Sequence, residues 1–127
     1  MITFENWFAN IASTADLIAS KDALWRAWVE GDRTITSAHD YGELAQQVLD
    51  DLDLEQLTKH FSSELRNIHA LETLVAFSRA FLGVDRSLEK NPILHDPSEL
   101  LKSSEWGSLM EAAQRIVELP SPRRGPR

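Results

Sequence analysis

Apolar residues recur at helical spacing along most of this 127-residue chain. Apolar side chains three and four positions apart share one face of an α-helix, whereas a half-buried strand alternates at every second residue. No long stretch of the sequence alternates in that way. The pattern therefore predicts an all-α protein, a compact bundle of about five to seven helices.

The stripes give approximate helix boundaries in the first part of the chain. The first stripe consists of Phe4, Trp7, Phe8 and Ile11. A second helix is expected over residues 15–30, beginning at Thr14 or Asp16 and ending at Gly31. A lysine inside its apolar stripe leaves open a break at Ser20, a residue that caps helices well.

Two capping signals then mark the starts of a third and a fourth helix. Residues 33–39 are expected to form a linker. Asp40 and Glu43 have the spacing of a capping box, with Asp in place of Ser or Thr. Asp53 is expected to cap the next helix in the same way, with Gln56 at the box position.

Turn-forming residues set the boundaries expected in the last third. The fourth stripe continues to Gly83, where that helix is expected to end, and residues 84–97 contain two X-Pro pairs and are predicted to be a loop. Ser98 is expected to cap a short turn, and Ser103 or Ser104 to start the last helix.

The length fits one domain, and we expect it to span residues 1–119. Residues 120–127 carry three prolines and three arginines and are expected to be a disordered basic tail. The chain has no cysteine, which excludes disulfides and fits a reducing cytoplasm. Its start lacks the pattern of a signal peptide, and no apolar stretch approaches the roughly 18 residues that span a bilayer. We therefore expect a cytoplasmic protein that does not associate with membranes.

Acidic residues dominate the charge. The formal net charge is −7, and because three arginines lie in residues 120–127, residues 1–119 hold 20 acids against 10 bases. From Glu30 to Glu64 there are nine acids and two bases. Such a surface repels nucleic acid and anionic membranes and attracts basic proteins. The charge can also serve solubility alone.

The predicted third helix concentrates this charge on the side opposite its apolar residues. No lysine or arginine occurs from Thr34 to Thr58. Natural surfaces usually mix the two signs, so a concentration of one sign indicates a partner of opposite charge. The predicted partner-binding residues are Asp40, Glu43, Gln47, Asp50, Asp51, Asp53 and Glu55.

Residues that could carry other chemistry are better explained as structural. His60 with Glu64, and His69 with Glu72, have helical pair spacing, but in one continuous helix the two histidines point about half a turn apart. A kink or turn at Asn67 would change that geometry. The chain has no nucleophile elbow, phosphate loop or zinc-protease motif. We therefore predict no enzyme activity, no metal and no cofactor.

Four tryptophans lie on apolar stripes: Trp7, Trp25, Trp28 and Trp106. Their spacing favours core packing, and a partly exposed tryptophan that anchors a partner is the alternative.

Residues 40–53, with the sequence DYGELAQQVLDDLD, resemble a segment of small immunity proteins of bacterial contact-dependent growth inhibition systems. The small size, acidity and helical pattern of the chain are also similar to that family. The resemblance implies a cytoplasmic protein that binds and neutralises a cognate toxin domain. Such toxins are often nucleases with basic clefts, which an acidic inhibitor complements. The alternatives are a helical adaptor or regulatory protein that binds another basic protein, and a metal- or ligand-binding helical domain.

Overall fold

The computed structural model describes residues 2–20, 22–65 and 68–119, with no side-chain description at 65 and 68. All regular structure in these residues is helical, so the predicted all-α fold is confirmed. The α-helices are α1 (Phe4–Ala19), α2 (Tyr41–Ala45), α3 (Leu54–His60), α4 (Ser62–Leu65), α5 (Ile68–Lys90), α6 (Pro97–Lys102) and α7 (Ser104–Val117). The other elements are the π-helices η1 (Trp25–Val29) and η2 (Gln46–Asp51) and the 3₁₀ helix η3 (Pro92–His95).

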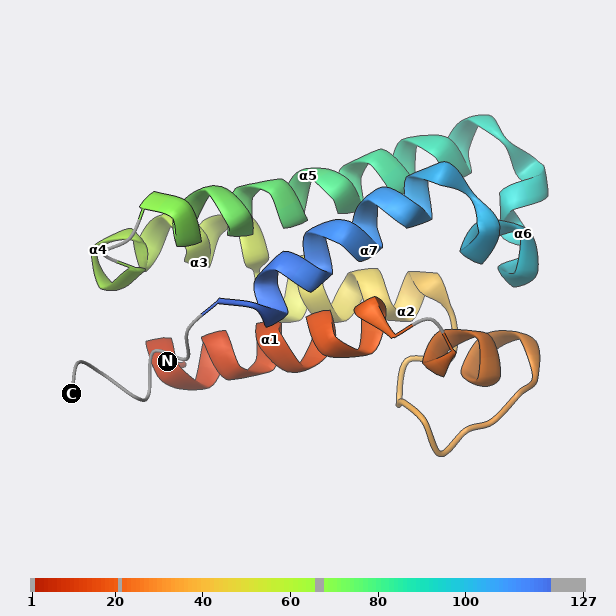
Figure 1. Ribbon diagram of the computed structural model, residues 1–127, viewed down its shortest axis with the longest axis horizontal. Coiled ribbons are helices and arrows are strands. Elements are labelled where there is room, and N and C mark those ends of the chain that lie inside the picture. Colours follow the sequence, from red (N-terminus) through yellow and green to blue (C-terminus); the bar gives the residue numbers. More distant parts are fainter. Residues whose placement is uncertain (1, 21, 66–67, 120–127) are drawn as a thin grey trace.

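Helix α7 lies at the centre of the bundle, packed against α5 on one side and α1 on the other. Figure 1 shows α5 and α7 running side by side in opposite directions, with α1 below α7 in this view. Helix α3 packs against α5, and α6 packs against η1 at the opposite end of the molecule. The short helices thus close the two ends of a frame built from α1, α5 and α7.

The buried side chains form one core cluster, to which every long helix contributes. Twelve large side chains are almost completely buried: Trp7, Trp106, Phe77, Phe81, Ile11, Ile18, Leu24, Leu44, Leu54, Leu74, Leu109 and Ile116. Aromatic rings meet edge to face within this cluster, for example Trp28 and Trp106 with centroids 5.7 Å apart. Such contacts add to the stabilisation from buried apolar area.

The first helix is longer than predicted. Helix α1 continues through Thr14 and Asp16, so neither residue starts a helix. The apolar stripe is unbroken because Ala15 and Ile18 follow Ile11 at helical spacing and are buried with it. The break does fall at Ser20, whose Oγ accepts a hydrogen bond from the Ala23 amide at 3.3 Å.

Helix α5 also continues beyond its predicted end. It passes through Gly83 to Lys90, so the loop predicted for residues 84–97 was wrong. Gly83 lies inside the helix without a positive φ, and Val84 beyond it is fully buried, which outweighs the low helix propensity of glycine. Residues 92–95 then form the 3₁₀ helix η3.

Asp96, rather than Ser98, caps α6, because its Oδ1 accepts a hydrogen bond from the Ser98 amide at 2.9 Å. The Ser98 hydroxyl and amide also hold the pKa of the Asp96 carboxyl below its ordinary value. Ser103 caps α7 as predicted, accepting from the Trp106 amide at 3.2 Å. Gly31 lies just after η1 at φ +77°, the left-handed conformation that glycine favours at a helix end.

No helix among the described residues is long and apolar enough to cross a membrane. The predicted tail, residues 120–127, lies outside the described residues, as does Asn67. The packing of α3 on α5 shows that the chain turns between these two helices, so His60 and His69 do not belong to one continuous helix.

Candidate binding surfaces

The predicted partner-binding residues lie along α2, η2 and the start of α3. Tyr41, Leu44 and Val48 on these elements are buried in the core, which turns the opposite side outward. We call that side the acidic surface: Asp40, Glu43, Gln47, Asp50, Asp51, Asp53 and Glu55. Five of these seven side chains are exposed, and Gln47 and Asp53 are half-buried.

At one end of the acidic surface, two carboxylates hold the start of α2. The Asp40 Oδ1 atom accepts a hydrogen bond from the Glu43 amide at 2.8 Å, which confirms the first half of the capping box. Glu43 Oε2 in turn accepts from the amide of His39, at 3.1 Å, one residue before the cap. Asp40 and Glu43 therefore stabilise the helix start as well as contributing negative charge.

Gln47 is directed toward the linker that precedes α2. Its Nε2 donates to the Ser37 hydroxyl at 3.4 Å. This contact joins the middle of the acidic surface to residues 33–39. Gln47 thus has a structural partner within the chain, which the helical wheel did not indicate.

At the other end, Asp50 and Asp51 are exposed on the last turn of η2. Neither side chain forms a hydrogen bond or ion pair with another described residue. The wider turn of a π-helix is uncommon and is frequently found at functional sites. Within the acidic surface, these two adjacent carboxylates are therefore not held by any contact that stabilises the described part of the fold.

The turn between η2 and α3 is held in an unusual backbone conformation. Asp53 has φ 46° and ψ 55°, the left-handed region, and its side chain makes no capping hydrogen bond. The predicted box of Asp53 with Gln56 is therefore wrong. The buried Trp7 indole Nε1–H donates to the Leu52 carbonyl at 2.7 Å, directly before the strained residue. This hydrogen bond fixes the turn against the core, and left-handed residues outside glycine are often associated with functional sites.

Glu55 follows on the first turn of α3 and pairs with Lys59 across 3.7 Å. It is the one ion pair in the described part of the chain, and both side chains are well exposed. An exposed pair of this kind contributes little to stability, typically below about 1 kcal/mol. The other acids of the acidic surface have no basic neighbour within ion-pair distance among the described residues.

Tyr41 ties the acidic surface to α5. Its hydroxyl donates a hydrogen bond to Asp85 Oδ1 at 2.6 Å and lies 3.2 Å from the Phe81 carbonyl. Burial raises the pKa of the Tyr41 phenol above its ordinary value, and the hydrogen bond to Asp85 raises it further. The phenol therefore stays protonated and holds α2 in place.

The histidines do not converge. His60 is exposed and meets the Phe61 ring edge to face, with centroids 4.8 Å apart. His69 is exposed on the first turn of α5, and His95 Nε2 lies 3.0 Å from the Leu88 carbonyl. In residues 2–20, 22–65 and 68–119, no three or more His, Asp or Glu side chains are grouped to hold a metal ion.

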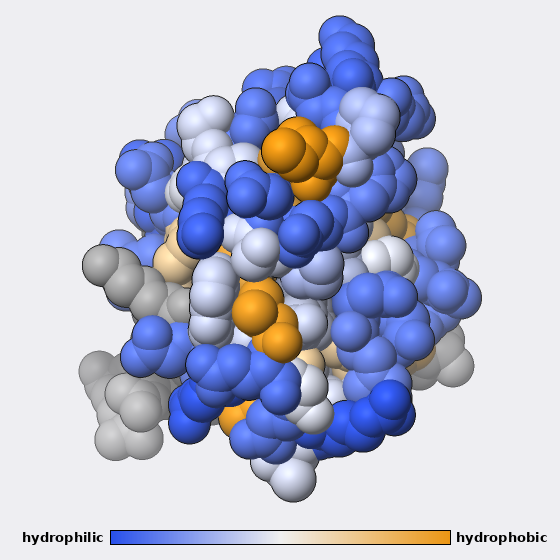
Figure 2. Space-filling view, turned by 90° about the vertical axis from the view of Figure 1, so that its right-hand side faces the viewer, coloured by the Kyte–Doolittle hydropathy of each residue, from blue (hydrophilic) through white to orange (hydrophobic). Residues whose placement is uncertain are grey.

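Three of the four tryptophans are buried in the core, as their spacing predicted. Trp28 also donates from Nε1 to the Ala38 carbonyl at 2.9 Å, which fastens the linker. Trp25 is half-buried, with the Lys102 ammonium 5.6 Å from its ring centroid. The exposed end of the molecule around η1 and η3 is mostly hydrophilic, and Figure 2 shows its hydrophobic residues as separate spots.

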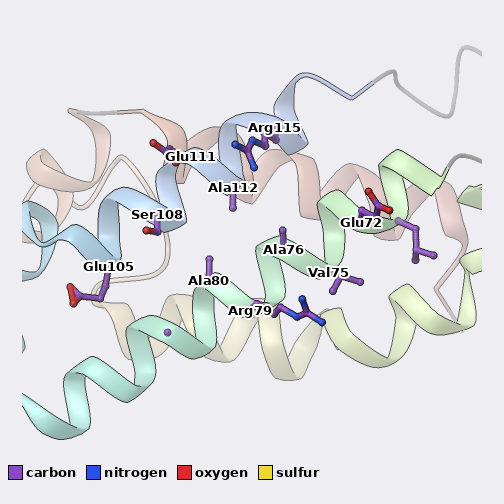
Figure 3. Close-up of a pocket in the computed structure, with 12 residues that line it drawn as sticks. Glu72, Val75, Ala76, Arg79, Ala80, Glu105, Ser108, Glu111, Ala112 and Arg115 are labelled. Carbon is purple, nitrogen blue, oxygen red and sulfur yellow. The ribbon is translucent and has the colours of Figure 1, made fainter.

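Two surface grooves flank α5, and nothing in the helical periodicity indicated them. One, of about 740 Å³, lies between α5 and α7, and the other, of about 480 Å³, lies between α5 and α3. Figure 3 shows Ala76 and Ala80 of α5 and Ala112 of α7 pointing into the first groove. Sequence periodicity identifies which residues face a neighbouring helix, but small residues at that contact can leave a groove that only the packed structure reveals.

No protein-family model, curated protein or solved structure matches this chain at a significant level.

Proposed function

We propose that this protein binds and neutralises a basic, nuclease-like toxin domain through its acidic surface. The observation that carries the proposal is the pair Asp50 and Asp51. These carboxylates are exposed next to each other and have no partner among the described residues. Keeping like charges together costs electrostatic free energy, so a benefit outside the folded chain is expected.

The frame around these carboxylates supports a binding role. The Trp7 hydrogen bond to Leu52 and the left-handed Asp53 set the end of η2, and the capping interactions of Asp40 set the start of α2. Side chains on a rigid frame lose less conformational entropy when a partner binds. A fixed acidic surface therefore suits rapid and specific recognition of a basic cleft.

A cytoplasmic location follows from this proposal, since the toxin domain would act on nucleic acid inside the cell. The resemblance of residues 40–53 to contact-dependent growth inhibition immunity proteins also implies a cytoplasmic protein that neutralises a toxin. An acidic surface would also fit a basic partner that is not a toxin. Growth protection distinguishes these alternatives, because only neutralisation of a toxin rescues growth.

The proposal predicts that a toxin domain is encoded immediately upstream of this gene, and the test is co-expression with that domain. We expect the parent chain to restore growth, and the Asp50→Lys/Asp51→Lys variant to lose protection. Glu43 is left unchanged because it accepts the His39 amide hydrogen bond, so its reversal would disturb the helix start. The matched control reverses two exposed acids elsewhere, Asp16→Lys and Glu89→Lys, with the same change in net charge.

The control variant should protect as well as the parent, and both variants should keep the parent's far-ultraviolet circular dichroism. Protection by Asp50→Lys/Asp51→Lys at the parent's level would remove the acidic surface from the mechanism. Absence of an upstream toxin, or failure of the parent to protect against it, would overturn the toxin proposal itself.

A further inference from the structure

A pocket of about 230 Å³ lies beside the first residue of the acidic surface. Its walls come from η1, the start of α2, the last turns of α5, η3 and α6, at the end of the molecule where Figure 1 labels α6. We call it the α2–α6 pocket, and its lining residues are Trp28, Asp40, Tyr41, Gly42, Leu88, Leu94, His95, Pro97 and Leu100. Pockets that hold drug-sized ligands measure roughly 300–1,000 Å³, so this smaller one suits a single side chain.

The aromatic part of the pocket wall is fixed by the core. Trp28 and Tyr41 are buried, and so is Leu100 beside them in the lining. Both aromatic rings meet the buried Trp106 edge to face, with centroids 5.7 Å apart for Trp28 and 6.1 Å apart for Tyr41. A wall held in this way keeps its shape without a ligand, so binding costs little conformational entropy.

Every side-chain hydrogen-bond donor in the lining is already used within the chain. The Trp28 Nε1–H donates to a carbonyl of the linker at 2.9 Å, and the Tyr41 hydroxyl donates to Asp85 Oδ1 at 2.6 Å. His95 Nε2 lies 3.0 Å from the Leu88 carbonyl, which can only accept, so Nε2 carries the proton. The lining side chains therefore offer no free donor to an anionic ligand.

Two hydrogen-bond acceptors in the lining remain available. Asp40 Oδ1 accepts from the Glu43 amide at 2.8 Å, whereas Asp40 Oδ2 has no hydrogen bond or ion pair with a described residue. In the neutral imidazole of His95, Nδ1 keeps its lone pair because the proton is on Nε2. Both residues are exposed, so a ligand can reach them. A fitting ligand is cationic, carries several donors and can lie against aromatic rings.

We propose that the α2–α6 pocket binds an arginine side chain of the basic partner, with the guanidinium paired to Asp40. A guanidinium has five N–H donors in one plane and stacks on aromatic rings, whereas the ammonium of lysine is more strongly hydrated. This inference rests on the proposed function only for the source of the arginine. It adds a specific contact at the end of the acidic surface remote from Asp50 and Asp51, and arginines seated in pockets often dominate the free energy of an interface.

The experiment is a titration of the full chain with argininamide, followed by proton–nitrogen correlation NMR. The Trp28 indole and Gly42 amide signals should shift saturably, with a dissociation constant on the order of 1 mM for so small a ligand. Citrullinamide has nearly the same shape without the charge. It should bind about fivefold more weakly, the upper range for loss of an exposed ion pair, and lysinamide should also bind more weakly than argininamide.

Asp40→Asn removes the charge but keeps a residue that caps helices as well as aspartate does. Argininamide should bind this variant about fivefold more weakly than the parent. Asp50→Asn is the matched control, because it makes the same change in net charge at an exposed residue that does not line the pocket. It should bind argininamide like the parent.

The proposal is overturned if argininamide causes no saturable shift, or if citrullinamide or lysinamide binds the parent as tightly. It is equally overturned if folded Asp40→Asn binds like the parent, or if Asp50→Asn weakens binding as much as Asp40→Asn, since that would be a general attraction to acids. The comparison of ligands on the parent decides the outcome if Asp40→Asn does not fold. None of these measurements uses a toxin domain, so failure of this proposal and failure of the toxin proposal are distinguishable.

Discussion

Tyr41 shows how one side chain couples the acidic surface to the core. It is the only tyrosine of the chain, and its hydroxyl interacts with two groups on α5. Its ring also packs against Trp106 edge to face, with centroids 6.1 Å apart. Because Tyr41 begins α2, these contacts fix the position at which the acidic surface starts.

The raised pKa of Tyr41 predicts a loss of stability at alkaline pH. Burial and the hydrogen bond to Asp85 favour the neutral phenol in the folded state over the unfolded state, where the pKa is about 10. This stabilisation is complete below about pH 10 and is lost as the pH rises from there toward the folded-state value. We expect phenolate absorbance to rise together with loss of helical circular dichroism.

Tyr41→Phe is the control for that titration. It should remove the contribution of the phenol to the pH dependence and lower the free energy of unfolding by about 1 kcal/mol, the usual effect of one lost hydrogen bond. Ionisation of Tyr41 near pH 10 while the helices stay intact would contradict this account of its environment.

Among the elements, the glycine that follows η1 and the glycine within α5 distinguish a helix end from a helix interior. Gly31 has φ +77° and ends η1, whereas Gly83 lies within α5, and an added Cβ meets nothing within 4 Å at either position. Gly31→Ala should therefore destabilise the fold by about 1 kcal/mol through backbone strain. Gly83→Ala should stabilise it by a similar amount, about 0.5–1 kcal/mol, because alanine is the better helix former.

Urea denaturation of the two variants measures both predicted changes in the free energy of unfolding, the decrease for Gly31→Ala and the increase for Gly83→Ala. If α5 ended at Gly83, with the glycine in a left-handed conformation, Gly83→Ala would destabilise the protein instead. That result would indicate that α5 ends at Gly83, as the sequence alone predicts.

Periodicity predicted the helical class and many of the helix starts, because apolar stripes and capping side chains act locally. The capping hydrogen bonds of Asp40 and Ser103 are examples. Helix ends were less predictable, since the burial of Val84 by distant elements carries α5 past Gly83. The outward placement of Asp50 and Asp51 was also predicted, but the left-handed turn at Asp53 depends on Trp7, 45 residues away from Leu52 in sequence.

The α5–α7 groove depends on tertiary structure in the same way. Its walls come from two helices that are adjacent only after folding, so neither helical stripe alone indicates it.

For the whole molecule, the distribution of charge leads to the central claim. The fold is held by the apolar core and by capping hydrogen bonds such as those of Asp40 and Glu43, whereas Asp50 and Asp51 make no hydrogen bond or ion pair with another described residue. We therefore infer that the value of Asp50 and Asp51 lies in association. Long-range attraction accelerates binding of an oppositely charged partner, and salt weakens it.

The most direct test is the association rate constant with the proposed toxin domain, measured by stopped-flow fluorescence at increasing ionic strength. The parent and the Asp16→Lys/Glu89→Lys control should bind rapidly at low salt and progressively more slowly as salt rises. Asp50→Lys/Asp51→Lys should bind at least about tenfold more slowly at low salt, with a weaker salt dependence. An Asp50→Lys/Asp51→Lys variant that associates as fast as the parent at low salt would contradict the central claim.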